Sequence, residues 1–288
     1  MARLKIPFPR PKVGEGSGDL ARDLLEIERA VNGIQGGGGI AGALVVDPLG
    51  NGDYLSLLDA LSFISGTGLT GWVIFVRGQT FETGNINFTD SDLTLIGMGG
   101  DSGVFDAGSH NFTFTQTVRT FGLQMGAHNL QFADAWITAG SVAADNFLGA
   151  DNIYGNNSDF VAGSSSITVD GSFHMNGGFL SAPLVECLGE GIFSGIDIFG
   201  AMQIDFESRG YLSGWMNSSV EIIGFDGVNF ALTMVGNTTT LTISTNKNVG
   251  TLTTTSSGNR LVVNGDRNKV LCGGVFTVTD TGTGNTFP

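Results

Sequence analysis

The chain has 288 residues, of which 41% are hydrophobic and only 14% are charged, and its formal net charge is −14. Such an acidic balance repels nucleic acid and anionic membranes, so neither is expected as a partner. The 46 glycines, beside only 6 prolines, exclude a collagen or a proline-rich disordered chain and favour a body of strands joined by turns.

The sequence shows no targeting or membrane signal. Residues 1–12 contain no apolar core of a secretory signal, and the longest uncharged apolar stretch, residues 40–46, is far shorter than the ~20 residues that span a bilayer. We therefore expect a soluble protein that is made in the cytoplasm. Cys187 and Cys272 are too few for a disulfide framework and are expected to be buried free thiols.

The first segment, residues 1–18, is basic and rich in proline. Its sequence, MARLKIPFPRPKVGEGSG, holds three of the six prolines and no hydrophobic periodicity, which predicts an extended arm with polyproline character. Such an arm does not fold alone, so we expect it to dock onto a partner. The candidate docking residues are its four cations, Arg3, Lys5, Arg10 and Lys12.

Residues 19–39 predict one short helix, capped by Asp19 and followed by a flexible joint at residues 36–39. Its apolar residues are spaced as the a and d positions of two heptads: Leu20, Leu24, Ile27, Val31 and Ile34. Leucine at a with isoleucine at d favours trimers and tetramers over dimers. A helix of about 22 Å is marginal alone, so this seam packs either against its own copies or against the body of the chain.

The body, residues 40–236, is predicted to begin with a short helix and to continue as short strands. Asp53 is expected to cap the helix, which bears Leu57, Leu58, Leu61 and Ile64. Segments rich in β-branched and aromatic residues then alternate with glycine and asparagine turns. The predicted strands are 72–76, 85–89, 93–97, 111–115, 129–138, 166–173, 195–200, 202–207, 220–225, 230–235 and 240–245. Strands this short suggest a sandwich, a barrel or a solenoid.

Two patterns favour the solenoid. Polar residues alternate with Phe, Ile, Leu and Val, and Asn-Phe or Asn-Leu steps recur at about 20-residue intervals in HNFTF, HNLQF, DNFLG and VNFAL. At about 22 residues per turn, the body would have about eleven turns and stand roughly 50 Å tall. A continuous aliphatic and phenylalanine core would account for the 21 phenylalanines.

The stretch VVDPLGNGDYLSLLDALSFI, followed by WVIFVRGQTF and SDLTLIGMGG, resembles the beginning of right-handed parallel β-helices of the pectate-lyase-like superfamily. There a short amphipathic helix caps the first turn. The resemblance covers residues 45–100 and implies a fold rather than an activity. With the basic arm and the heptad helix in front, the chain is similar to trimeric tailspikes or head fibres of tailed bacteriophages. We therefore expect an all-β, right-handed parallel β-helix that is homotrimeric.

The last region, residues 237–288, is rich in Thr and Asn and repeats at a shorter spacing, since Asn259 and Asn268 are nine positions apart. This spacing indicates narrower turns or strands interleaved among chains. We expect this region to be a β-rich trimerisation end.

Asp205 and Glu207, in the stretch MQIDFESRG, are the candidate catalytic residues. Alternation that turns Ile204 and Phe206 inward places both carboxylates outward, about 7 Å apart at Cα. Glycoside hydrolysis needs two carboxylates, one as acid and one as base or nucleophile. The alternative is a solvated face of an acidic protein. Other carboxylates in this window are Glu186, Glu190, Asp197, Glu221 and Asp226, and the candidate sugar-stacking residues are Phe173, Tyr211 and Trp215.

No motif implies a metal or a cofactor. His110, His128 and His174 lack metal-ligand spacing, and GGGGIAG lacks the lysine of a P-loop. The stretch DPLGNGD offers oxygen ligands but departs from the calcium-loop pattern, so we interpret it as a turn before the helix.

Two functions remain open from the sequence. In the first, the chain is a structural protein of a bacteriophage virion, a trimeric spike or fibre held on capsid, portal or tail proteins through residues 1–35. Its β-helix would contact a host surface polysaccharide or decorate the particle. In the second, the same trimer is a tailspike that cleaves polysaccharide as a glycoside hydrolase. The small body favours the first, and the missing secretory signal argues against a secreted bacterial adhesin.

Overall fold

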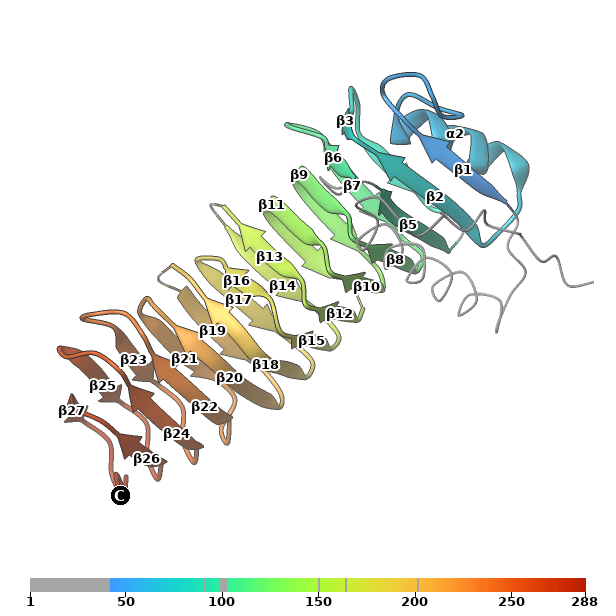
Figure 1. The fold of residues 1–288 in the computed structure, drawn as a ribbon. Helices are drawn as coiled ribbons and strands as arrows, with labels where there is room; N and C mark the ends of the chain where they lie inside the picture. The colour runs from blue at the N-terminus through green and yellow to red at the C-terminus, as the bar shows by residue number, and fades with distance from the viewer. Residues whose placement is uncertain (1–41, 91, 99–102, 150, 164, 201) are drawn as a thin grey trace, which may run out of the picture. The chain divides into compact units, whose positions relative to one another are not determined.

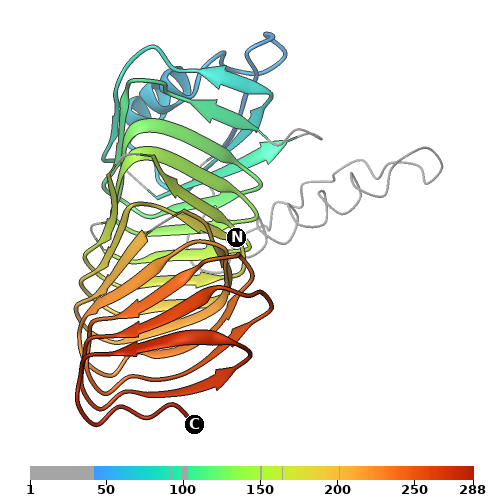
Figure 2. The same cartoon turned by 90° about the vertical axis from the view of Figure 1, so that its left-hand side faces the viewer.

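A computed structural model describes residues 42–90, 92–98, 103–149, 151–163, 165–200 and 202–288. Over these residues the chain winds into a parallel β-solenoid of about 11 turns (Figure 1). Successive turns stack along one axis, with the helix at one end and the C-terminus at the other (Figure 2). The predicted all-β fold, a parallel β-helix with about eleven turns, is confirmed.

The strands form three ladders, which we call faces A, B and C. Face A contains β1 (Ala43–Val46), β2 (Trp72–Arg77), β5 (Leu93–Met98), β8 (Val118–Phe121), β10 (Ala135–Thr138), β12 (Ile153–Asn156), β15 (Phe173–Asn176), β18 (Gly191–Ile198), β20 (Gly210–Met216), β22 (Asn229–Met234), β24 (Val249–Thr254) and β26 (Lys269–Gly273). Face B contains β3 (Gln79–Phe81), β6 (Val104–Asp106), the first halves of β9 (Gln124–Phe132) and β11 (Ser141–Gly149), β13 (Asp159–Ala162) and β16 (Phe179–Ser181). Face C contains β4 (Ile86–Phe88), β7 (Asn111–Phe114), the second halves of β9 and β11, β14 (Ser166–Val169), β17 (Leu184–Cys187), β19 (Met202–Phe206), β21 (Val220–Gly224), β23 (Thr240–Ile243), β25 (Asn259–Val263) and β27 (Phe276–Asp280).

The length of a turn varies along the axis. Ala43 pairs with Val73, 30 positions later, whereas Arg119 pairs with Trp136, 17 positions later. The turn that starts at Val249 measures 20 residues, because Val249 pairs with Lys269. The expected 22 residues per turn therefore lies between long early turns and shorter later ones.

Helix α2 (Leu57–Thr67) covers the first turns. Leu57, Ala60, Leu61 and Ile64 are buried on its inner face. The prediction that Asp53 caps this helix was wrong. Ser56 is the N-cap, because it directly precedes the first helical residue, and its hydroxyl oxygen accepts from the amide of Asp59.

Two other carboxylates accept hydrogen bonds from backbone amides near this helix. The carboxylate of Asp53 accepts instead from the amide of Val45 and so holds the turn after β1. The buried carboxylate of Glu82 accepts from the amides of Leu57 and Leu58, at 2.9 and 3.0 Å, where the helix dipole favours a negative charge.

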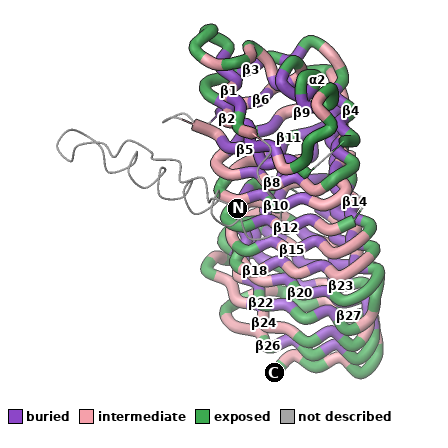
Figure 3. Tube along the Cα trace, turned by 90° about the vertical axis from the view of Figure 1, so that its right-hand side faces the viewer, coloured by how far each residue is buried: buried purple, intermediate pink, exposed green. Residues whose placement is uncertain are grey.

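Phenylalanine rings form the axis of the core. Nine of them contact one another in sequence, with centroids 4.2 to 6.5 Å apart: Phe105, Phe112, Phe114, Phe132, Phe147, Phe160, Phe173, Phe193 and Phe206. All nine are buried, and Figure 3 shows buried residues recurring along the stacked strands. Gly191 and Gly210 lie against the last ring, where a Cβ would overlap Phe206. The expected phenylalanine core is confirmed.

Faces A and B merge in the later turns. β16 pairs with the second half of β18, which pairs through its first half with β15 of face A. The register between β18 and β20 shifts at Phe193 and Ile196, and the neighbouring Gly214 has a φ of 144°. From β18 onward each turn therefore has two strands instead of three, and from β20 to β22 onward the register runs without a break.

Polar ladders hold the turns of the last region. The side-chain oxygen of Asn248 accepts from the amide of Val228, Asn268 accepts from Asn248, and Asn285 accepts from Asn268 at 2.7 to 2.8 Å. The spacing of nine positions does not mark one turn in this region, and the described strands pair within the chain. β22, β24 and β26 pair within the chain at 20-residue spacing, and the nine positions from Asn259 to Asn268 separate two strands rather than two turns.

Candidate functional site

Four carboxylates gather on face C and form what we call the acidic patch: Glu186, Asp205, Glu207 and Glu221. The predicted alternation in β19 is confirmed, since Ile204 and Phe206 are buried and Asp205 lies on the outer side. Glu186 is the register partner of Asp205 on the preceding turn, and Glu207 follows the last residue of β19. The patch therefore joins residues from three successive turns.

Hydrogen bonds distinguish Asp205 from its neighbours in the acidic patch. Glu186 accepts from the Thr168 hydroxyl at 2.8 Å, and Glu221 accepts from Gln203 at 3.1 Å and from Ser244 at 2.8 Å. Within the described residues, Asp205 Oδ1 has no hydrogen-bond partner although it is buried. It lies against Gly224 of the next turn, where a Cβ would overlap it.

This environment raises the pKa of Asp205. Desolvation is the largest cause, and the neighbouring charges of Glu207 and Glu186 add to it. A carboxyl that keeps its proton to a higher pH beside ionised carboxylates has the chemical character of a general acid. Among the described residues, the acidic patch therefore resembles the carboxylate pair of a glycoside hydrolase.

The other carboxylates of the predicted window lie elsewhere. Glu190 lies 3.4 Å from His174 Nε2 and 3.3 Å from Arg209, at the turn that precedes face A. Asp197 belongs to the face B half of β18, and Asp226 accepts from the amide of Asn246 in a C-terminal turn ladder. Residues 186–226 cover two full turns, so carboxylates that are close in the sequence lie on different faces of the solenoid.

A column of alternating carboxylates and aromatic rings runs along face B, and we call it the acid–aromatic column: Asp159, Phe179, Asp197 and Trp215. Phe179 pairs with Asp197, and Asp197 pairs with Trp215. Asp159 occupies the same column one turn earlier, because the adjacent Phe160 and Leu180 are partners. Trp215 is 50% exposed, and the exposed Phe199 contacts Phe179 with ring centroids 4.7 Å apart.

Of the predicted sugar-stacking residues, the structure places only Trp215 in this column. Tyr211 lies on face A, four residues before Trp215 and about 13 Å away along the strand. Phe173 is fully buried in the core. Sequence analysis missed Asp159 and Phe179, whose only signal is their spacing of about two turns and one turn from Asp197.

A stack of side chains on face A resembles a binding platform, but its rings already pack against one another. Arg119 lies over Trp136, and the rings of Trp136 and Tyr154 are nearly parallel with centroids 5.1 Å apart. His174 meets Tyr154 edge-on. Both ring faces of Trp136 are therefore used, which leaves no free face for a sugar ring.

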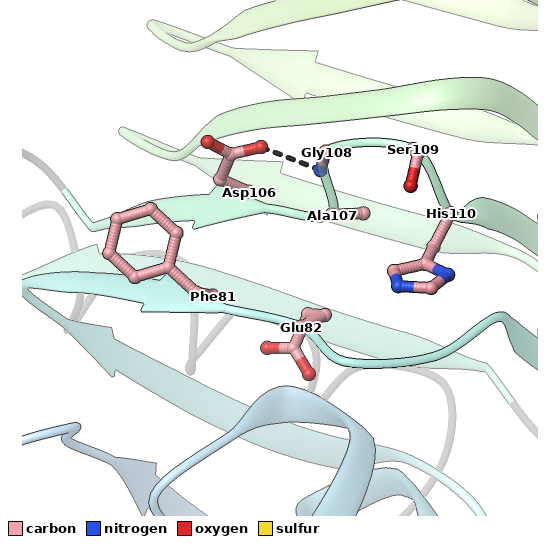
Figure 4. Close-up of a pocket in the computed structure, with 7 residues that line it drawn as sticks. All are labelled: Phe81, Glu82, Asp106, Ala107, Gly108, Ser109 and His110. Atoms are coloured by element: carbon pink, nitrogen blue, oxygen red, sulfur yellow. Dashed lines mark hydrogen bonds between the residues drawn. The ribbon is translucent and has the colours of Figure 1, made fainter.

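A pocket near the first turns is lined by Phe81, Glu82, Asp106, Ala107, Gly108, Ser109 and His110 (Figure 4). Both carboxylate oxygens of Glu82 accept amides of helix α2, and Asp106 accepts from the amide of Gly108. Because these carboxylates already bind backbone amides, the pocket is a weaker candidate for a functional site than the carboxylates of faces B and C.

The remaining predicted sites were placed as follows. The seam (Leu20, Leu24, Ile27, Val31 and Ile34) and the arm cations (Arg3, Lys5, Arg10 and Lys12) lie outside the described residues. Within the described ranges, no group of three or more His, Cys, Asp or Glu could hold a metal ion, and no helix is long and apolar enough to cross a membrane. Burial raises the pKa of both thiols, and Cys272 is half-buried rather than buried as expected.

Comparison with known proteins adds no relative. No family model, no curated protein and no solved structure matches the chain.

Proposed function

We propose that this chain is a structural protein of a bacteriophage virion, a homotrimeric spike or fibre that attaches to a glycan on the host surface. Residues 1–35 would anchor it to other virion proteins, and the solenoid would project outward. The described solenoid supports this proposal as a stiff rod, because every turn is hydrogen-bonded to the next. The virion location rests on the resemblance of the sequence to bacteriophage tailspikes and head fibres.

The acid–aromatic column carries the glycan part of the proposal. Exposed aromatic rings stack against the apolar faces of sugars, and carboxylates accept hydrogen bonds from hydroxyls. Trp215 and Asp197 are direct partners on adjacent turns, so one sugar ring could meet both. Turns are about 4.8 Å apart, close to the length of a pyranose ring, so a linear glycan would lie along the solenoid axis.

Binding of the full chain to a panel of purified capsular and O-antigen polysaccharides tests this proposal. For a glycan that binds, Trp215→Ala and Asp197→Asn should each weaken the affinity about tenfold, a loss of ~1.4 kcal/mol. Phe225→Ala is the matched control, because this ring is equally exposed, at 53%, and lies outside the column. Unchanged affinity in both column variants would refute the assignment.

The trimer is tested through the native mass by light scattering. The intact chain should give a mass near three times 30.0 kDa. In the full chain, Ile27→Asp together with Val31→Asp should lower that mass, because charges at the seam oppose helix association. A monomeric wild-type protein would contradict the trimer.

A second candidate function, cleavage of the bound polysaccharide, is favoured by the acidic patch. Asp205, with its raised pKa, would be the acid, and Glu207 or Glu186 the base or nucleophile. Register partners are about 4.8 Å apart at Cα, near the separation of about 5–5.5 Å between the carboxyl groups of retaining glycosidases. New reducing ends that disappear in Asp205→Asn, with glycan binding kept, would establish this activity, and their absence in wild type would exclude it for that glycan.

A further inference from the structure

The two carboxylates of the acid–aromatic column, Asp159 and Asp197, are unpaired within the described residues. Both side chains are exposed, and neither takes part in a hydrogen bond or an ion pair there. Glu190 differs, because its carboxylate lies 3.3 Å from Arg209. The negative charges of the column are therefore not neutralised by neighbouring side chains and remain available to a ligand.

Positive side chains are scarce in this part of the chain and lie away from the column. Residues 42–236 contain 20 carboxylates but only three cations, Arg77, Arg119 and Arg209. Arg77 and Arg209 are paired with carboxylates, Arg119 lies over Trp136, and none of the three belongs to the column. A surface of this sign attracts positively charged ligands and repels acidic ones.

The aromatic rings of the column favour cations as well. Phe179 and Trp215 are the register partners of Asp197 on the preceding and the following turn, so two rings flank one carboxylate. The negative face of an aromatic ring attracts an ammonium group, and the same face stacks against the apolar side of a sugar ring. A sugar with a protonated amine would therefore be attracted by both kinds of side chain, whereas an acidic sugar would be repelled by both.

The spacing of the two carboxylates matches a repeat of two sugars. Asp159 and Asp197 lie two turns apart in the column, with Phe179 between them. Their Cα atoms are therefore about 9.6 Å apart, close to the length of two pyranose rings in an extended chain. In a cellulose-like chain successive sugars face opposite sides, so equivalent groups recur on one edge at every second sugar. Each carboxylate would thus meet the same group of the glycan.

We propose that the acid–aromatic column binds a linear glycan that carries protonated amino groups, as in a polymer of glucosamine whose nitrogens are not acetylated. The amines lie at Asp159 and Asp197, and the sugars between and after them stack on Phe179 and Trp215. This inference rests on the glycan binding of the proposed function and names the class of glycan. Uronic, sialic and phosphorylated glycans are excluded as ligands of the column, because their charges have the sign of its carboxylates.

Calorimetric titration of the full chain with three tetrasaccharides tests the proposal: a glucosamine tetramer, its N-acetylated form and a galacturonate tetramer. In mildly acidic buffer, which protonates the amines, the glucosamine tetramer should bind about tenfold more tightly than the other two, a difference of ~1.4 kcal/mol. Asp159→Asn together with Asp197→Asn should remove this preference, because an amide keeps the size of the carboxylate and an acceptor oxygen but loses the charge.

Asp170→Asn is the matched control. It removes one exposed carboxylate from the turn after β14, outside the column, so it should keep the preference for the amine. Far-ultraviolet circular dichroism and thermal unfolding report that each variant is folded. A preference that survives in the double variant, or that the control loses to the same extent, would overturn the proposal. Equal or tighter binding of the acetylated or the acidic tetramer by the wild-type protein would overturn it as well.

The failure of this inference and the failure of the proposed function give different results. If the wild-type protein prefers an acetylated or acidic glycan and Trp215→Ala weakens that binding, the column binds glycans and only the assignment of the amine is refuted. If Trp215→Ala and Asp197→Asn leave the affinity for every bound glycan unchanged, the column is not the glycan site and both proposals are refuted.

Discussion

The middle and the end of the solenoid hold their turns together with different side chains. From Phe105 to Phe206 a chain of contacting phenylalanine rings fills the core. Beyond Asn229 the inward residues are mainly aliphatic, such as Leu241, Leu252 and Leu261, and buried asparagines connect one turn to the next. Aliphatic side chains and asparagines therefore take the place in the last turns that phenylalanines take in the middle.

This difference shows that the same parallel strand pairing is stabilised in two ways, by aromatic packing in the middle and by asparagine hydrogen bonds at the end. Aromatic rings stabilise the middle through buried area and through stacked or edge-on ring contacts, which tolerate more than one angle. The asparagine ladder of the end satisfies amides that turn inward and would otherwise remain unpaired, so it depends on each partner. We therefore expect the middle to respond to lost volume and the end to respond to lost hydrogen bonds.

The largest expected effect comes from emptying the middle of the core. Phe173 contacts Phe160 and Phe193 edge-on and is fully buried. Phe173→Ala should destabilise the protein by about 3–5 kcal/mol, through lost burial and a residual cavity. Chemical denaturation measures the change, and the exposed Phe225→Ala should shift the free energy of unfolding by no more than about 0.5 kcal/mol. Equal effects of the two would mean that the ring chain does not support the middle.

A smaller loss is expected from the asparagine ladder. Asn248→Ala leaves the buried amide of Val228 without its acceptor and removes the side-chain donor to Thr245. The cost should be about 1–3 kcal/mol, the usual penalty for an unpaired buried group. Asn264→Ala is the control, since its side chain makes a single 3.5 Å contact to Ser244 and accepts from the Thr281 hydroxyl at the surface. Faster hydrogen exchange confined to the turns around Val228 would locate the loss.

The smallest effect concerns the acidic patch, which the end of the solenoid lacks. A raised pKa in the folded state means that Asp205 favours folding while protonated and that this contribution is lost as the pH rises through its folded pKa. Asp205→Asn should therefore raise the melting temperature at neutral pH, and the gain should vanish below the ordinary carboxyl range. A gain of the same size at every pH would show that ionisation of Asp205 is not its cause.

Sequence patterns were enough for the fold and for most strands of face C. The alternation in MQIDF assigned inward and outward residues of β19 correctly, and the Asn-Phe steps revealed the turns. The segment 129–138 was predicted as one strand, but the chain bends at residues 133–134 between β9 and β10. A corner between two faces leaves no signal in hydrophobic alternation, because both strands keep the same period.

The sequence by itself determined that this chain forms stacked short strands with a phenylalanine core, because strand alternation and ring burial are local properties of its residues. Only the tertiary structure decided which side chains become neighbours across turns, such as Glu186 with Asp205 or Asp197 with Trp215. The residues of these pairs lie 19 and 18 positions apart, and the length of a turn varies from 17 to 30 residues along the solenoid. A shift of one residue in any turn would place different side chains on each face.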